Sequence, residues 1–341
     1  IFVEMRMLHW PDSMATYLTG DNILFSNDAF GQHYAVEELF NDKADQCLLD
    51  KESMKYFANI LNPFAAILTK KLAEIDALNL PIEMIAPSHG AIWRQEPLRI
   101  VAKYAKWAGA YQEDQITVAY DTMWEGTAKI ARRIADEIHR QSPDTVVKVF
   151  NIAKADKNEV MTEVFRSKAI AVGSPTVSGG ILSSVAGWLE FLKQLKFRNK
   201  KAAAFGCYGW SGESVKVLRE RLKDAGFDVI DENVRSLGTP ERKISPPFPL
   251  WRRNFLGDRR HQRKRDFEVS RGKNEKGDSK MKYVVNESCI GCGLCATTCP
   301  EVFSMTDAGV AAAIAEEVAE ENRDSAAEAR ENCPVGAIEE V

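Results

Sequence analysis

The stretch Ile116-Thr-Val-Ala-Tyr-Asp-Thr-Met-Trp-Glu-Gly-Thr127 decides the fold of the central part of the chain. Its first five residues form a short apolar run rich in β-branched side chains, which predicts a buried strand over 116–120. The loop that follows leads into a predicted helix over 127–139. A strand that passes through a short loop into a helix is half of a βαβ unit and predicts a parallel sheet.

The same alternation continues through residues 113–238. Further strands are predicted over 146–150, 169–173, 202–205 and 228–231, and further helices over 159–165, 181–195 and 214–225. Five strands with intervening helices predict an open, doubly wound parallel sheet. Right-handed crossovers place the loops after the strands on one edge of that sheet. Residues 113–238 are therefore assigned to one flavodoxin-like domain of the α/β class.

Three loops at this edge contain the residues of a mononucleotide site. The loop over 120–127 offers hydroxyl groups and helix N-terminal N–H groups but no Lys or Arg, which favours one phosphate monoester over a triphosphate. That pattern suits FMN at the switch point of a flavodoxin-like sheet. The loops over 173–180 and 206–213 are also rich in Gly and hydroxyl groups, and the latter carries aromatic rings that can stack on a flavin. The candidate cofactor contacts are Thr122, Met123, Trp124, Gly126, Thr127, Ser174, Pro175, Thr176, Gly179, Tyr208, Gly209 and Trp210.

These loops also allow a simpler interpretation, as ordinary strand-to-helix connections with helix caps. Three of them on one edge favour the mononucleotide, because open sheets bind ligands there. Cys207 lies in the third loop and is expected to be a small packing residue.

A cysteine motif marks the C-terminal part of the chain. Cys289-Ile-Gly-Cys292-Gly-Leu-Cys295-Ala-Thr-Thr-Cys299-Pro300 is followed by Cys333-Pro334, 38 residues after Cys295. This is the spacing of a bacterial ferredoxin with its remote cysteine. Two four-iron clusters would need about eight thiolates, so five cysteines predict a single [4Fe-4S] cluster. The predicted ligands are Cys289, Cys292, Cys295 and Cys333, with Cys299 left as a free thiol.

Two other interpretations of the cysteines are weaker. A disulfide framework is typical of secreted chains, and no secretory signal is visible here. A zinc site would not need three evenly spaced thiolates followed by Cys-Pro. Gly291 and Gly293 keep side chains out of the tight loop, which suits a cluster held close to the backbone.

Length and composition bound the remaining possibilities. The chain has 341 residues, of which 45% are hydrophobic and 28% charged, which is typical of two or three globular domains. Its longest apolar runs are far too short to cross a bilayer. The first residue is Ile rather than Met, so we expect the chain to lack its natural start, and a reducing cytoplasm is the default location.

Charge is distributed unevenly near the C-terminus. Residues 241–280 contain 13 Lys/Arg against 6 Asp/Glu, whereas residues 282–341 contain 3 against 12. The run Ser245-Pro-Pro-Phe-Pro249 cannot be helical, so residues 239–280 are assigned to a basic, Pro-rich, disordered linker. Residues 281–341 are assigned to a ferredoxin domain. The basic stretch could dock an acidic redox partner, or it could be a solvated linker only.

Residues 1–112 mix short strands, turns and helices. Apolar residues recur at helical spacing over 52–80, and Pro63 should kink or divide that helix. Cys47 is expected to pack in the core, His33 to be a loop residue, and His139 to lie on a helix surface.

Four sequence blocks carry a family resemblance. Met7-Leu-His-Trp-Pro-Asp-Ser-Met14, Ser26-Asn-Asp-Ala-Phe-Gly-Gln-His33, Pro87-Ser-His-Gly-Ala-Ile-Trp-Arg94 and Tyr120-Asp-Thr-Met-Trp124 resemble the flavodiiron proteins, in the family's order. The resemblance covers about residues 1–238. It implies that residues 1–112 are the C-terminal part of a metallo-β-lactamase-like diiron domain, in a multidomain protein of the α/β and α+β classes.

The resemblance also implies metal ligands, namely His9, Asp28 and His89. In the family the aspartate bridges two irons and each histidine binds a different one, and imidazole and carboxylate suit non-haem iron. Taken alone, these residues would be interpreted as ordinary loop residues. The family's upstream H-x-E-x-D block is absent, so half of the implied ligand set is missing. We therefore expect a fragment of a longer protein that binds iron poorly at this site. The family's closing helix after Asp231 is replaced by the linker.

The implied activity is that of a cytoplasmic oxidoreductase. Electrons would pass from the [4Fe-4S] cluster through FMN to a diiron site that reduces O2 to water or NO to N2O, in a head-to-tail homodimer supplied by a reductase or rubredoxin. The alternative is an electron-transfer flavoprotein–ferredoxin module without a working metal site. A zinc hydrolase of the β-lactamase type would have no use for a flavin or a cluster. No nucleic-acid or membrane partner is expected.

Overall fold

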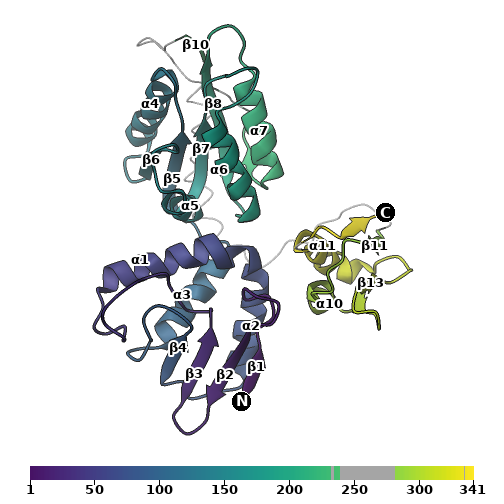
Figure 1. The fold of residues 1–341 in the computed structure, drawn as a ribbon. Helices are drawn as coiled ribbons and strands as arrows, with labels where there is room; N and C mark the ends of the chain where they lie inside the picture. The colour runs from purple at the N-terminus through teal and green to yellow at the C-terminus, as the bar shows by residue number, and fades with distance from the viewer. Residues whose placement is uncertain (232–233, 239–280, 334) are drawn as a thin grey trace.

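The computed structural model describes residues 1–231, 234–238, 281–333 and 335–341, so the predicted linker over 239–280 lies outside the described residues. Figure 1 shows three folded units, namely an N-terminal region, a flavodoxin-like domain and a small C-terminal domain. Within the described ranges, no helix combines the length and apolar character that a membrane span requires.

The N-terminal region is built on a four-stranded mixed sheet. Its strands β1 (Phe2–Glu4), β2 (Met14–Leu18) and β3 (Ile23–Asn27) are antiparallel, and β4 (Met84–Pro87) pairs parallel with β3. Burial alternates along β2 and β3, because successive side chains of a strand point to opposite faces. Ala15, Tyr17 and Leu24 lie on the buried face, and the loops after β1, β3 and β4 carry the predicted metal ligands.

A long helical segment packs beside this sheet and breaks at Pro63. It runs through α1 (Gln46–Tyr56), a π turn (Phe57–Leu61), a 3-10 turn (Asn62–Phe64) and α2 (Ala65–Ala77), and α3 (Leu98–Ala108) follows later. The predicted interruption at Pro63 is confirmed, since proline cannot donate the next helical hydrogen bond. The segment begins earlier than predicted because Asp45 caps it by accepting from Leu48 N at 2.9 Å.

The prediction for Cys47 is wrong. Its side chain is exposed. It lies in the first turn of α1, whereas the buried residues of that helix are Leu49, Ser53 and Tyr56. Helical register therefore turns Cys47 toward solvent.

The central domain is a six-stranded parallel sheet with helices on both faces. Its elements are β5 (Glu113–Tyr120), α4 (Gly126–Gln141), β6 (Val146–Asn151), α5 (Lys157–Arg166), β7 (Ser167–Gly173), α6 (Ser183–Gln194), β8 (Lys201–Tyr208), α7 (Ser214–Asp224), β9 (Asp228–Val229) and β10 (Val234–Leu237). The order β6-β5-β7-β8-β10 is the flavodoxin-like order, which confirms the predicted fold class for this domain. β9 pairs with the start of β8 and β10 with its end, so the fifth edge position holds two short strands where one was predicted.

Alternate residues of the central strands pack into two apolar cores, one on each face of the sheet. Ile116, Val118 and Tyr120 pack with the buried residues of α4, whereas Ala119 belongs to the core shared with α5, α6 and α7. Because both faces are covered, the strand is apolar throughout, which is why the sequence showed a continuous run there.

The C-terminal domain contains two small antiparallel pairs and two helices. β11 (Tyr283–Val285) pairs with β14 (Ile338–Glu340), and β12 (Phe303–Met305) pairs with β13 (Ala311–Ala313). The helices are α10 (Leu294–Thr298) and α11 (Arg323–Glu331), the latter preceded by a 3-10 turn (Glu320–Asn322). The small core includes Tyr283, Phe303 and the alanines of α11.

The N-terminal region meets the central domain at α5 and at the turn after α6. Lys55 Nζ donates to Glu159 Oε1 at 3.0 Å, and Asn62 Nδ2 donates to Leu195 O at 2.7 Å. These contacts lie on the side where β7 and β8 begin. The loops that follow β5, β7 and β8 lie at the opposite ends of the same strands, away from residues 1–112 (Figure 1).

Candidate redox sites

The predicted flavin loops come together at the C-terminal edge of the parallel sheet. Tyr120 is in register with Gly173, and Gly173 with Phe205, so the loops that follow begin side by side. Backbone hydrogen bonds continue into the loops, from Ser174 N to Phe205 O at 3.2 Å and from Thr176 N to Cys207 O at 2.9 Å. The sheet thus holds three separate loops in one arrangement.

The hydroxyl groups of these loops differ in what they contact. Thr127 Oγ1 lies 3.3 Å from Cys207 Sγ, Ser174 Oγ accepts from Leu182 N at 3.0 Å, and Thr176 Oγ1 lies 3.0 Å from the hydroxyl of Ser214. Thr122 Oγ1 is buried and has no hydrogen-bond partner among the described residues. A buried hydroxyl without a partner is costly, so Thr122 is the group that an additional acceptor at this loop would satisfy.

Two loops present aromatic rings to solvent. Trp124 is 83% exposed and Trp210 88% exposed, and Tyr208 lies half-buried beside the latter loop. Large exposed rings at a strand-end edge offer a stacking surface. Of the other predicted contacts, Met123 precedes α4 and Gly126 begins it, Pro175 and Gly179 lie in the loop after β7, and Gly209 follows β8. Cys207 packs against the α4 core, as predicted.

The predicted metal ligands of the N-terminal region also converge. His9 follows β1, Asp28 follows β3 and His89 follows β4. His9 Nε2 lies 3.5 Å from Asp28 Oδ2, and His89 Nε2 lies 3.4 Å from Asp28 Oδ1. Each carboxylate oxygen therefore faces a different imidazole, which is the disposition that a carboxylate between two metal ions would have.

A buried glutamine fixes the two loops that carry Asp28 and His89. Gln32 Oε1 accepts from Ala91 N at 2.7 Å, and its Nε2 donates to Ala91 O at 3.2 Å. His89 Nδ1 lies 3.2 Å from Gln32 O. Gly90 has φ +81°, and a Cβ there would come within 1.9 Å of Gln32 Oε1, so the turn requires glycine.

Two further aromatic side chains surround His89. The ring centroids of His33 and Tyr56 each lie 5.0 Å from that of His89 and 4.9 Å from one another. Burial, followed by the charges of His89 and His9, lowers the pKa of His33. Burial and the charge of Asp28 raise the pKa of Tyr56, whose hydroxyl has no hydrogen-bond partner among the described residues. The sequence placed His33 in a nearby loop but gave no sign of Tyr56.

The four predicted cluster ligands line one cavity in the C-terminal domain. Cys289, Cys292, Cys295 and Cys333 all contribute to it, although Cys333 is remote in sequence. Backbone N–H groups approach two of the sulfurs, from Ala311 to Cys289 Sγ at 3.4 Å and from Ala337 to Cys333 Sγ at 3.2 Å. Such donors stabilise thiolates that bind iron.

The fifth cysteine of the motif lies elsewhere. Cys299 is fully buried in the small core, and Ser325 Oγ donates to its sulfur at 3.2 Å.

Burial, followed by the nearby Cys292 and Cys289, raises the pKa of Cys295 to about 11. A thiol in such surroundings becomes a thiolate when a metal binds it.

Gly291 lets the cysteine loop approach the β12–β13 hairpin. It has φ +68°, and a Cβ there would lie 2.0 Å from Gly309 O. Within the described ranges, no group of three or more His, Cys, Asp or Glu closes around a single metal ion.

Two family models match parts of the chain. The model described as flavodoxin matches residues 118–247. The model described as the 4Fe-4S single cluster domain of ferredoxin I matches residues 285–340.

Several curated proteins are similar to the N-terminal two thirds of the chain. The anaerobic nitric oxide reductase flavorubredoxins of Klebsiella pneumoniae and Salmonella typhi are each 54% identical over 229 residues, which are 67% of this chain and 48% of each relative. The chain thus spans about half the length of these relatives.

Solved structures give the same result for the fold. The rubredoxin oxygen:oxidoreductase of Desulfovibrio gigas has a TM-score of 0.68 and 37% identity, over 71% of this chain and 60% of that one. The flavodiiron protein of Giardia intestinalis has a TM-score of 0.67 and 32% identity, over 71% of this chain and 59% of that one. The predicted resemblance and fold class are confirmed.

Proposed function

Since this chain is related to the flavodiiron proteins and carries a single-cluster ferredoxin domain, we propose that it is an oxidoreductase that carries electrons between one [4Fe-4S] cluster and FMN. The terminal acceptor in the whole protein is nitric oxide or dioxygen. The observation that supports this most is the presence, in one chain, of four cysteines around one cavity and of three clustered strand-end loops with an unpartnered hydroxyl.

The flavin edge fits FMN through groups that the structure leaves available. Thr122 and the N-terminus of α4 would hold the phosphate, and Trp124, Tyr208 and Trp210 would flank the ring. A bound flavin accepts two electrons and releases them one at a time. Because no Lys or Arg lies in the phosphate loop, the cofactor is held by neutral donors.

The cluster would be held by Cys289, Cys292, Cys295 and Cys333 and would supply one-electron transfer. The backbone donors at Ala311 and Ala337 would offset the negative charge of two of these thiolates. A donor reductase or rubredoxin would supply the electrons. Fusion to the flavodoxin-like domain raises the effective concentration of the carrier near the flavin.

His9, Asp28 and His89 are proposed as part of a diiron ligand set. Two imidazoles that face one carboxylate suit non-haem iron. The flavin edge points away from residues 1–112 of the same chain. This supports a head-to-tail homodimer, in which the flavin of one copy faces the metal site of another.

Reaction with the gases tests the proposed function. The chain is loaded with both cofactors, reduced without air and mixed with nitric oxide or oxygen in a stopped-flow instrument. A nitric oxide or oxygen reductase reoxidises its flavin faster than free FMN reoxidises. Reoxidation no faster than that of free FMN would contradict the reductase and leave the electron-transfer module. The electron-transfer module is the second candidate function, and it is favoured by the metal site, where three candidate ligands come together among the described residues.

Flavin affinity should depend on Thr122. Replacing it with valine keeps the shape of the side chain but removes the buried donor, so the dissociation constant for FMN should rise about ten-fold, as for a lost hydrogen bond to a charged acceptor. Fluorescence titration of the flavin-free chain measures this. Thr69→Val, on the exposed face of α2, is the matched control. Equal affinities of the two variants for FMN would contradict the assignment of Thr122 to the flavin site.

A further inference from the structure

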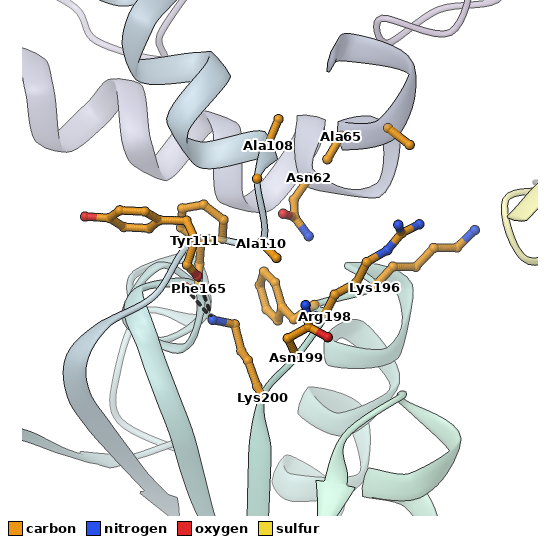
Figure 2. A pocket seen from close by; sticks show the side chains of 13 residues that line it. Asn62, Ala65, Ala108, Ala110, Tyr111, Phe165, Lys196, Arg198, Asn199 and Lys200 are labelled. Carbon is orange, nitrogen blue, oxygen red and sulfur yellow. Dashed lines mark hydrogen bonds between the residues drawn. The ribbon is translucent and has the colours of Figure 1, made fainter. Parts of the chain in front are cut away.

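Three basic side chains of the first two domains contact the C-terminal domain. Lys196 Nζ donates to Glu331 O at 3.0 Å, and Arg198 Nη2 donates to Asn332 Oδ1 at 3.0 Å. Lys70 Nζ, on α2, lies 3.4 Å from Thr298 O. Figure 2 shows Lys196 and Arg198 extending out of the interdomain pocket, toward the side where the C-terminal domain appears.

The contacted residues lie next to the cluster cysteines. Glu331 and Asn332 immediately precede Cys333, and Thr298 ends the helix that contains Cys295. Leu294, beside Cys295, is 5% exposed and belongs to the same apolar core as α6, and Cys292 packs against that core. The face that carries the cluster-binding residues is therefore turned toward the rest of the chain.

Charge favours this contact. Residues 282–341 carry 3 Lys/Arg against 12 Asp/Glu, whereas the contacting side chains on the other domains are all cations. The pKa of Lys196 is lowered overall, by burial and then by the charge of Arg198, and the charges of Cys333 and Glu331 offset part of that decrease. The acidic charges that act on Lys196 thus come from the C-terminal domain.

The contact lies at the edge of the sheet opposite to the flavin loops. Lys196 and Arg198 precede β8, and they line the pocket between residues 108–111 and 196–200 (Figure 2). The flavin loops follow the C-terminal ends of the strands. β8 has 8 residues, so the two edges are about 26 Å apart along the strand.

The turn that carries these cations is firmly held. Lys200 is 3% exposed, and its Nζ donates to Tyr111 O at 3.0 Å, Phe165 O at 2.8 Å and Ser167 O at 2.7 Å. These hydrogen bonds tie residues 196–200 to the interdomain segment and to the end of α5. The turn that carries Lys196 and Arg198 is therefore held in place by the hydrogen bonds of Lys200.

We propose that Lys70, Lys196 and Arg198 form a docking site for the ferredoxin domain of the same chain, which holds its cluster-binding face away from the flavin edge of that chain. This inference rests on the proposed function for the identity of the flavin edge. Electron transfer to the chain's own flavin then requires release of the docked domain. Salt weakens contacts between exposed charges, so ionic strength favours release.

Zero-length cross-linking with a carbodiimide tests the docking directly. The reagent joins an amine to a carboxylate as an amide with loss of water, and mass spectrometry of the digested, cofactor-loaded chain identifies the pair. Lys196 Nζ donates to the backbone carbonyl of Glu331, and the Glu331 carboxylate is near enough to act on the Lys196 charge, so at low salt Lys196 should be joined preferentially to Glu331. Arg198→Glu should lower the yield of that pair about ten-fold, as expected for loss of a charged hydrogen bond and its replacement by repulsion. Arg221→Glu, on the exposed side of α7, is the matched control and should leave the yield unchanged.

Two outcomes would overturn the docking site. One is cross-linking of Lys196 to acidic residues throughout the domain without preference for Glu331. The other is a Lys196–Glu331 yield that Arg198→Glu does not lower. Because the assay reads a covalent bond, a chain without flavin gives the same product, and failure of the proposed function is distinguishable from failure of the docking site.

Discussion

Replacing Cys333 with alanine should abolish the iron–sulfur absorption of the purified chain while leaving the flavin bound. Cys333 lines the cavity shared by the other three predicted ligands, and the backbone N–H of Ala337 lies 3.2 Å from its sulfur. A four-iron cluster needs about four thiolates, and loss of one leaves an iron without its ligand. The iron content should therefore fall from about four atoms per chain to a trace, as measured by iron analysis and visible spectroscopy.

Cys299→Ala is the matched control for this change. It also removes a sulfur from the same motif, but Cys299 is buried in the small core, where Ser325 donates to it, and it does not line the cavity. Cys299→Ala should retain about four irons per chain. The ligand assignment would be wrong if Cys299→Ala lost the cluster and Cys333→Ala kept it.

The second large effect concerns Lys200. Its ammonium group satisfies three backbone carbonyls at the junction between residues 1–112 and the central domain. Methionine would fill a similar volume but leave these carbonyls without a donor, at about 1–3 kcal/mol for each buried unsatisfied group. Lys200→Met should therefore lower the free energy of unfolding by about 3 kcal/mol or more. The midpoint of urea unfolding, followed by circular dichroism, measures this.

The pH dependence of stability carries a second signature of Lys200. Burial lowers its pKa to about 7, against the opposing effect of Glu113, whereas an unfolded lysine titrates near 10.4. Between about pH 7 and pH 10 the unfolded chain binds more protons, so this group's contribution to stability rises with pH and is constant below that range. Lys200→Met should lose this rise, and Lys216→Met on exposed α7 should keep it. Identical pH profiles for the two variants would contradict the role given to Lys200.

The central domain was predictable because its strands are buried on both faces. Ile116–Tyr120 gave a continuous apolar run, and each predicted strand and helix of residues 113–225 is present, with ends shifted by a few residues. The sequence predicted only one of the two short strands at the last edge of the sheet. Val234–Leu237 extends the edge beyond Asp228–Val229, but the polar Asp231 after the first strand gave no sign that a second strand follows.

Local spacing predicted the cysteine motif, whereas tertiary packing produced the features that were missed. Cys333 could be assigned with the other cysteines because the ferredoxin motif has a characteristic remote partner. Tyr56 reaches His89 only because α1 packs across the loop that carries that histidine. Lys200 is an ordinary lysine in sequence, and its burial depends on carbonyls contributed by residues 111, 165 and 167.

Joint analysis of iron and flavin is the most direct test of the central claim, that one chain carries both an iron–sulfur cluster and a flavin. The chain is purified without air, and iron, acid-labile sulfide and FMN are measured against protein. We predict a yellow-brown preparation with about one FMN and about four irons per chain, and about six irons if a diiron site is also filled. A colourless preparation without flavin and without iron sulfide would contradict the account.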